Sequence, residues 1–256
     1  MCGRFVSAST PDELANYFGA EPPDRELEPN FNVAPTREIY VVRARSGHRQ
    51  MATLTWGLVP FWAKDRRIGS KMINARSETV LNKPAFRQAI GRRRCLIPAD
   101  GFYEWMKVPG NKKKQPYYIH HRDGEPLAFA GIWERWSPPE GSDETLPGGA
   151  ETLETCTILT CAPNETLAAI HNRMPVLLAP NSWDEWLADT EDLSALQGLM
   201  VPAPDGVLTM RPVRPMVNSV RNNGPELLEV ETMPLSAEME AEDSDGTETL
   251  GGGPAL

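Results

Sequence analysis

The residue with the most distinctive chemistry is Cys2, which directly follows Met1. A methionine followed by a small residue is normally removed, and its removal would leave Cys2 at the start of the chain. Cys2 would then carry an α-amine with a reference pKa of about 8 beside a thiol with a reference pKa of about 8.5. Such a 1,2-aminothiol condenses with an aldehyde, first to an imine and then to a five-membered thiazolidine ring.

Other interpretations of Cys2 stay open on its position alone. It could be an N-terminal nucleophile for amide hydrolysis, or an ordinary buried cysteine. If residues 2–8 form a strand, Arg4 lies on the same face as Cys2, and its positive charge should lower the pKa of the thiol.

Three further side chains could move or orient protons. Glu104 lies in the aromatic segment 101–105, which should raise the pKa of its carboxyl group toward the range useful for acid–base catalysis, unless the side chain faces solvent. His171 could transfer a proton near neutral pH, or it could cap the end of a helix. Asn74 can donate or accept a hydrogen bond, although residues 73–78 could also be the start of a helix.

The charge of the chain is unevenly distributed. The total is −9, but residues 1–221 hold 26 basic and 26 acidic residues, and nine acidic residues follow Asn222 without any Lys or Arg. Residues 43–122 hold 18 basic and four acidic residues, a net charge of +14. A basic stretch interleaved with aromatic residues is typical of proteins that bind single-stranded nucleic acid, whereas a solvated surface is the common alternative. Within this basic stretch, Arg76 could bind a phosphate through two guanidinium N–H groups, and Trp62 could stack on a base.

Composition excludes several classes of protein. No run approaches the ~18 apolar residues of a membrane span, and the first residues do not form a signal peptide. The four cysteines, without such a signal, indicate free thiols in a reducing cytoplasm, and their spacing matches no zinc site. We therefore expect no metal, no cofactor and no membrane partner. The cysteines are Cys2, Cys95, Cys156 and Cys161.

The pattern of elements predicts one α+β domain, dominated by antiparallel strands with short peripheral helices. Strands are expected at 2–8, 38–45, 51–58, 94–106 with a break at Asp100-Gly101, 115–121, 127–135 and 155–161, with a final pair in 207–217. Helices are expected after a Thr10–Glu13 capping box and at 84–91, 164–171, 182–188 and 192–199. Residues 22–36, 59–72 and 109–114 are expected to be loops. The domain is expected to span 1–225, with an acidic mobile insertion at 137–155 and a disordered acidic tail at 226–256.

Six sequence blocks, taken together and in this order, resemble the SRAP family of abasic-site processing proteins, which were first described as SOS response-associated peptidases. The resemblance covers about residues 2–220 and implies the barrel-like fold of that family. The blocks are MCGRF at 1–5, NVAP at 32–35, WGLVPFW at 56–62, INARSET at 73–79, PADGFYEW at 98–105 and IHNRMP at 170–175.

The resemblance implies a function and a set of residues. Cys2 would form a stable covalent thiazolidine link to the ring-opened aldehyde of an abasic site in single-stranded DNA, shielding the lesion in a lyase-like reaction. The catalytic residues would be Cys2, Asn74, Glu104 and His171, and the DNA contacts would be Arg4, Asn32, Pro35, Trp62, Arg76 and Arg173. The partner would be single-stranded DNA with abasic sites, bound by a monomer in the cytoplasm, at the nucleoid. The insertion and the tail lie outside the core pattern of the family.

Two other functions remain as alternatives. One is a cysteine peptidase with autoproteolytic removal of Met1, which would use Cys2, Glu104 and His171 as nucleophile, acid–base group and proton carrier. The other is a non-covalent reader of single-stranded DNA, whose binding would fall steeply with salt.

Overall fold

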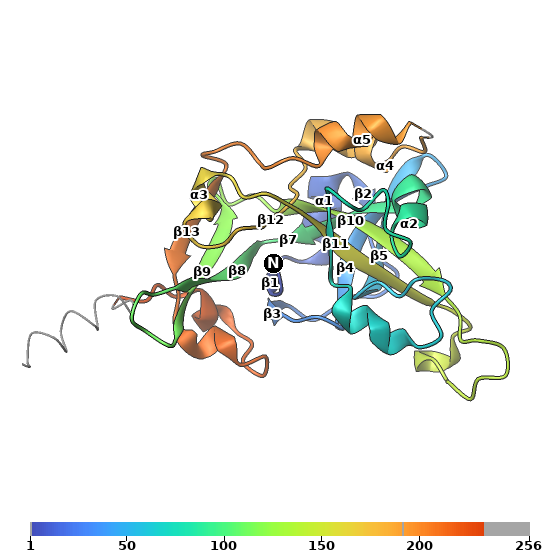
Figure 1. The fold of residues 1–256 in the computed structure, drawn as a ribbon, viewed down its shortest axis with the longest axis horizontal. Helices are drawn as coiled ribbons and strands as arrows, with labels where there is room; N and C mark the ends of the chain where they lie inside the picture. Colours follow the sequence, from blue (N-terminus) through green and yellow to red (C-terminus); the bar gives the residue numbers. More distant parts are fainter. Residues whose placement is uncertain (1, 191, 233–256) are drawn as a thin grey trace, which may run out of the picture.

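The computed structural model describes residues 2–190 and 192–232, and its strands form two sheets (Figure 1). The strands are β1 Phe5–Ser7, β2 Ala20–Glu21, β3 Asn30–Val33, β4 Glu38–Arg45, β5 His48–Trp56, β6 Asn74–Arg76, β7 Arg94–Ala99, β8 Gly101–Lys107, β9 Lys114–His121, β10 Leu127–Trp136, β11 Leu153–Cys161, β12 Met174–Pro175 and β13 Leu208–Pro212. The α-helices are α1 Pro11–Phe18, α2 Arg87–Arg92, α3 Glu165–Ala168, α4 Trp183–Leu187 and α5 Leu193–Leu199. The 3-10 helices are η1 Arg66–Lys71, η2 Pro147–Gly149, η3 Pro180–Ser182, η4 Pro215–Asn218 and η5 Pro225–Leu228.

The larger sheet closes into a barrel of five strands. β4 pairs with β5 and β7, β7 pairs with β10, and β10 pairs with β11, all antiparallel. The ring closes where β11 runs parallel to β5, through the pairs Thr155–Thr55 and Cys156–Trp56. Closure leaves these strands without a free edge, and all six residues of β7 are buried. The short helices lie around the barrel, so the prediction of a barrel-like α+β domain is confirmed (Figure 1).

The second sheet has the order β13-β9-β8-β1-β3, and the chain passes into it directly from the barrel. The passage is at Asp100-Gly101, where the sequence predicted a break between two strands. The Asp100 carboxylate accepts hydrogen bonds from the backbone N–H groups of Ala8 at 2.6 Å and Ser9 at 3.1 Å. A Cβ atom at Gly101 would lie 2.6 Å from the Ile119 carbonyl oxygen, so only glycine fits here. This junction aligns β1 beside β8, which brings the start of the chain to Glu104.

The N-terminal strand is followed by α1, whose capping box has the predicted form. The Thr10 hydroxyl accepts from the Glu13 N–H at 3.3 Å, and the Glu13 carboxylate accepts from the Thr10 N–H at 2.9 Å. Leu14 and Phe18 bury the apolar side of the helix in the core, and Gly19 ends it in the left-handed conformation at φ 58°.

Several elements differ from the sequence prediction. β1 covers only part of 2–8, and β3 and η1 lie in the segments predicted as loops. β6 is a strand, not the start of a helix, and α3 ends at Ala168, before His171. The segment 207–217 contains one strand and part of η4 in place of a strand pair.

The two acidic segments also need new boundaries. Residues 153–155 belong to β11 and pair with β10, so the insertion ends near residue 152. Residues 226–232 belong to the described fold, because Leu227 is buried and Val230 bridges to Val213. The predicted disordered tail therefore starts too early, and residues 233–256 lie outside the described residues.

Candidate functional site

Cys2 lies at the meeting point of three chain segments. Its side chain is fully buried, next to the strand pair in which the Tyr103 N–H donates to the Arg4 carbonyl at 3.0 Å. The Asn74 side-chain amide donates to the Cys2 carbonyl at 2.9 Å. The start of the chain, β8 and β6 therefore converge through these two hydrogen bonds. Figure 1 marks the N-terminus near the middle of the view, beside β1 and β8.

Asn74 is positioned by long-range pairing. β6 runs parallel to β11, with Asn74 opposite Ile158, and the preceding carbonyl of Ile73 accepts a hydrogen bond from the Trp56 indole at 2.9 Å. Trp56 is fully buried in the barrel, so the backbone around Asn74 is fixed by the core. The amide is thereby held at the Cys2 backbone, and its role in orienting the amine stays a prediction.

Glu104 is a buried acid beside Cys2. Only 3% of its surface is exposed, and this burial raises the pKa of its carboxyl group from 4.5 to about 7. The prediction of a raised pKa is confirmed, and the alternative of a side chain that faces solvent is wrong. A carboxyl group with a pKa of about 7 can both accept and donate a proton at neutral pH.

The Cys2 thiol differs from its sequence prediction. Burial raises its pKa well above the ordinary value, the negative charge of Glu104 raises it further, and a hydrogen bond with the Arg4 backbone lowers it only in part. The expected lowering by the Arg4 guanidinium fails because that group binds elsewhere in the fold. The thiol is therefore neutral in the folded protein until a base removes its proton.

The Nδ1 atom of His171 lies against the backbone of Arg173. It is 3.0 Å from the Arg173 nitrogen and 3.3 Å from the Arg173 carbonyl oxygen, so it accepts from the N–H in one tautomer and donates to the carbonyl in the other. Burial lowers the pKa of His171, and the positive charges of Lys114 and Arg173 lower it further. Because α3 ends earlier, His171 does not cap that helix.

Lys114 is a residue of this region that the sequence reasoning missed. Its positive charge lowers the pKa of both Glu104 and His171, so it lies within electrostatic reach of both groups. The sequence feature that could have identified Lys114 is the β8–β9 hairpin. Its register pairs Lys114 with Lys107, so Lys114 lies on the strand next to the one that carries Glu104.

The predicted DNA contacts fall into two groups, and the first holds the fold together. Arg4 donates to the Asn32 side-chain oxygen at 2.7 Å and to the Val217 carbonyl at 3.0 Å. The Asn32 amide in turn donates to the carbonyls of Val217, Ser219 and Asn222. Both residues therefore fasten the segment 217–222 beside Cys2, and their contact with DNA stays a prediction.

Arg173 also belongs to this group. It forms a two-pronged ion pair with Glu78 and donates to the Thr160 carbonyl at 2.5 Å. Its side chain is 15% exposed. These contacts tie the segment after α3 to β11 and to the turn after β6.

The second group is accessible. Arg76 is exposed on β6, two residues after Asn74, Trp62 is 50% exposed, and Pro35 is partly exposed. Phe61, beside Trp62, is 51% exposed. These side chains are free to meet a large partner without unfolding of the core.

Trp62 is carried by a well-anchored segment, residues 57–73. The Val59 N–H donates to the Thr155 hydroxyl at 2.9 Å, and the Trp136 indole donates to the Ala63 carbonyl at 2.7 Å. At its base, a Cβ atom on Gly57 would lie 2.7 Å from the Gly69 carbonyl oxygen, so the two backbones approach as only glycine permits. The segment thus presents exposed aromatic side chains from a fixed base.

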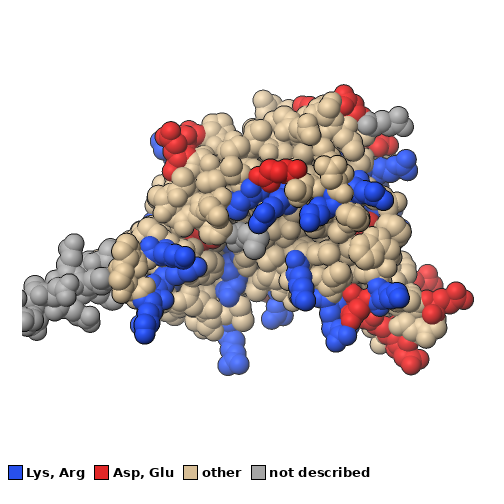
Figure 2. All heavy atoms as spheres, viewed as in Figure 1, with Lys and Arg blue, Asp and Glu red and all other residues tan. Residues whose placement is uncertain are grey.

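Basic side chains gather on the face that contains the N-terminus. Figure 2 shows Lys and Arg distributed around the centre of this face, while acidic side chains lie just above the centre, among the basic ones, and toward the upper and lower right edges. The arrangement suits a polyanion that crosses the face over Cys2.

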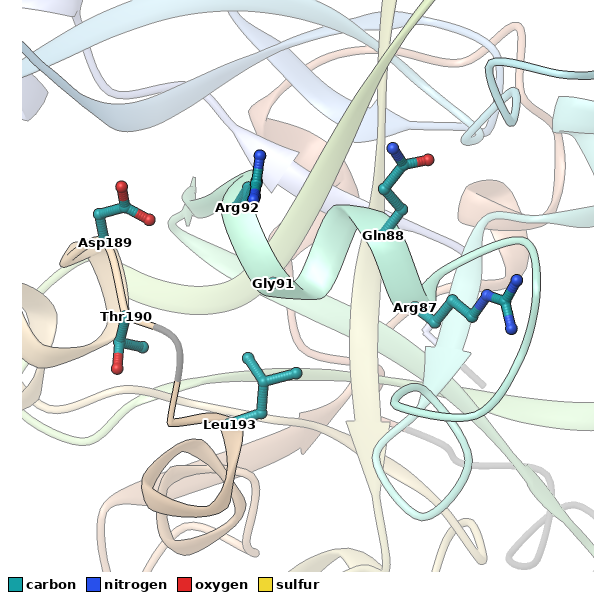
Figure 3. Close-up of a pocket in the computed structure, with 7 residues that line it drawn as sticks. All are labelled: Arg87, Gln88, Gly91, Arg92, Asp189, Thr190 and Leu193. Atoms are coloured by element: carbon teal, nitrogen blue, oxygen red, sulfur yellow. The ribbon is translucent and has the colours of Figure 1, made fainter.

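A cavity of about 760 Å³ lies elsewhere, between α2 and the start of α5 (Figure 3). It contains none of the predicted site residues, and its side chains do not converge on one point. They are Arg87, Gln88, Gly91, Arg92, Asp189, Thr190 and Leu193. In the described part of the chain, His, Cys, Asp and Glu form no cluster that could hold a metal, and no helix is long and apolar enough to cross a membrane.

Comparison with known proteins gives a family. The SRAP family, described as SOS response associated peptidase, matches residues 1–220. The chain is 41% identical to the abasic site processing protein YoqW of Bacillus subtilis over 232 residues, which are 90% of this chain and 99% of YoqW. It is 32% identical to the abasic site processing protein HMCES of Rattus norvegicus over 237 residues, with 78% of this chain and 64% of HMCES covered.

Solved structures show the same fold. A protein from Bacteroides thetaiotaomicron superimposes with a TM-score of 0.79 at 24% identity, over 90% of this chain and all of the other. A protein from Bordetella bronchiseptica gives a TM-score of 0.69 at 26% identity, over 83% of this chain and all of the other.

Proposed function

The chain belongs to the SRAP family, and from this premise we propose that it captures abasic sites in single-stranded DNA through a covalent thiazolidine link to Cys2. The observation that carries the proposal is the joint burial of Cys2 and Glu104, with Asn74 bonded to the Cys2 backbone. The relatives named abasic site processing proteins support the choice of substrate. The protein would act as a monomer in the cytoplasm, at the nucleoid, without metal or cofactor.

The reaction requires the α-amine of Cys2, so Met1 must first be removed. An abasic sugar exists mainly as a closed ring, and opening it needs a proton on the ring oxygen. His171 in its protonated, imidazolium form supplies this proton and becomes neutral, and it recovers a proton from the amine nitrogen when the carbinolamine forms. Glu104, in its ionised form, takes the proton of the anomeric hydroxyl, and the aldehyde is released.

Bond formation then proceeds in two stages. The neutral amine attacks the aldehyde carbon, and the carbinolamine loses water to give an imine, with protonated Glu104 donating to the leaving hydroxyl. The Cys2 sulfur next adds to the imine carbon while its proton passes to the nitrogen. The ring closes with one water released overall, and no free imine remains to drive cleavage of the DNA strand.

The high pKa of the thiol fits this order of events. A buried neutral thiol does not compete with the amine for the aldehyde, and it reacts only when an imine lies beside it. A cysteine peptidase needs a thiolate at the start of its reaction, and the surroundings of Cys2 disfavour that form. The geometry therefore supports the crosslinking function over the peptidase function.

Intact mass spectrometry tests the proposal directly. The protein is incubated with a single-stranded oligonucleotide made abasic by excision of one uracil. The expected product lacks Met1 and gains the mass of the oligonucleotide minus one water, and it survives denaturation. Cys2→Ala retains an amine but no thiol, so it should give no stable product and should increase strand cleavage through the open imine. An equal yield of stable adduct from Cys2→Ala would overturn the proposal.

A further inference from the structure

The acidic insertion is in direct contact with the segment that carries Trp62. Residues 137–152 contain four acidic side chains and no Lys or Arg. Leu146 of this insertion is only 6% exposed and packs in one apolar cluster with Val59, Ala63 and Trp136. The insertion is therefore anchored on segment 57–73 by burial of a large apolar side chain.

The anchor brings one carboxylate onto a basic residue of that segment. Glu144 Oε1 lies 2.7 Å from Arg66 Nε, with their side chains 25% and 41% exposed. Arg66 is in η1, a few residues after Trp62, within the basic stretch of the chain. A carboxylate and a DNA phosphate use the same guanidinium N–H groups, so the two compete for Arg66.

Glu144 differs from the other acids near η1. Asp65 accepts from the Arg67 backbone N–H at 2.8 Å and from its guanidinium Nε at 2.7 Å, so it caps its own turn. Glu144 instead reaches Arg66 from a distant part of the sequence. Arg66 also lines a cavity of about 1,070 Å³, which is bounded by other residues of η1 and by residues within 146–155.

We propose that Glu144 is a specificity-determining residue that occupies on Arg66 the position of a DNA phosphate. The inference rests on the proposed function and concerns how the same protein distinguishes abasic from undamaged single-stranded DNA. Any single strand that uses Arg66 must displace Glu144, and this weakens reversible binding to all sequences. An abasic strand is retained by its covalent bond, so its capture depends less on the lost contact. The carboxylate thus favours damaged over undamaged DNA.

The test measures reversible binding, which does not depend on the covalent reaction. Dissociation constants for an undamaged single-stranded oligonucleotide are measured by fluorescence anisotropy at several salt concentrations. Glu144→Gln should bind about 3- to 10-fold more tightly than wild type near 50 mM salt, with a salt slope steeper by about one, because one more phosphate contact forms. Glu140→Gln removes an equal charge from an exposed site of the same insertion and is the matched control.

Arg66→Ala completes the design as a double-mutant cycle. In the Arg66→Ala background, the Glu144→Gln change should leave the affinity unaltered. The inference is overturned if Glu140→Gln has the same effect, if the effect persists without Arg66, or if Glu144→Gln binds like wild type. Adduct formation by the wild type is recorded separately, so a failure of the crosslinking proposal is distinguished from a failure of this one. Melting temperatures of all variants confirm that each is folded.

Discussion

Polar groups are buried around Cys2, whereas they are exposed to solvent in the segment 57–73. Around Cys2, the thiol and the Glu104 carboxyl group are almost completely buried, and burial moves both pKa values upward. In segment 57–73, Phe61 and Trp62 are half exposed, and Arg66 and Arg67 pair with carboxylates at the surface. Surface ion pairs contribute little to stability and exchange partners readily.

The difference separates two tasks. Dehydrated groups with shifted pKa values suit proton transfer, which needs a fixed and water-poor environment. Exposed aromatic and basic side chains suit reversible contact with a long polyanion. Substitutions in the first region should therefore change reaction rates, and substitutions in the second should change affinity and its dependence on salt.

The strongest test of this separation is Glu104→Gln. Loss of a general acid–base group should slow adduct formation about 10²- to 10⁴-fold. The wild-type rate should rise with pH through about 7, the pKa of Glu104, and this inflection should be absent from the variant. Affinity for a non-reactive abasic analogue should stay within about twofold of wild type. A large loss of that affinity would show that the region around Cys2 also governs binding, and would contradict the assignment of the two tasks to two regions.

The same variant should be more stable than wild type at high pH. Burial raises the pKa of Glu104 from 4.5 to about 7, so the folded chain holds this proton more tightly than the unfolded chain. That contribution is fully present below about pH 4.5 and is lost as the pH rises through about 7. Urea unfolding near pH 8 should show Glu104→Gln more stable by up to about 3 kcal/mol, with little difference near pH 4.5. A variant less stable at pH 8 would contradict the account of burial.

Trp62→Ala should weaken reversible binding of single-stranded DNA without loss of stability. Removal of one stacking partner costs about 1–3 kcal/mol, which is roughly 5- to 150-fold in Kd. Because half of its surface is already exposed, the melting temperature should change little. Phe61→Ala, equally exposed and adjacent, is the control and should have a smaller effect. Equal losses of DNA affinity in the two variants would show that Trp62 is not a specific stacking partner for a base.

Arg76→Ala should give the smallest effect. Loss of one phosphate contact should reduce the salt slope by about one and the affinity only a few-fold at moderate salt. Arg92→Ala removes an exposed arginine from α2 and should leave the slope unchanged. If both variants behave alike, Arg76 acts through net charge alone.

The sequence predicted the elements that local signals define. The Thr10–Glu13 capping box, the strand at 38–45 and the break at Asp100-Gly101 are all present. β3 and β6 were missed because they are short and form through pairing with distant strands, β1 and β11. The composition of a short segment does not show which distant strand it will pair with.

In the candidate site, too, features set by neighbouring residues were predicted and features set by distant residues were missed. The raised pKa of Glu104 followed from its aromatic neighbours in sequence. The high pKa of the Cys2 thiol did not, because Arg4 turns away to Asn32 and Val217, which are remote in sequence. Lys114 was missed for the same reason, since its relation to Glu104 depends on the register of a hairpin.

The bonds from Arg4 to Val217 and Asn218 have a consequence for synthesis of the protein. These partners are 213 and 214 residues apart, so the N-terminal segment leaves the ribosome long before the chain that encloses it exists. At about 5–20 residues per second, this interval lasts roughly 10–40 s. During it, the first residues are open to a methionine-removing enzyme, whereas in the finished fold Cys2 is fully buried. Translation order thus provides a period for maturation before the reactive cysteine is enclosed.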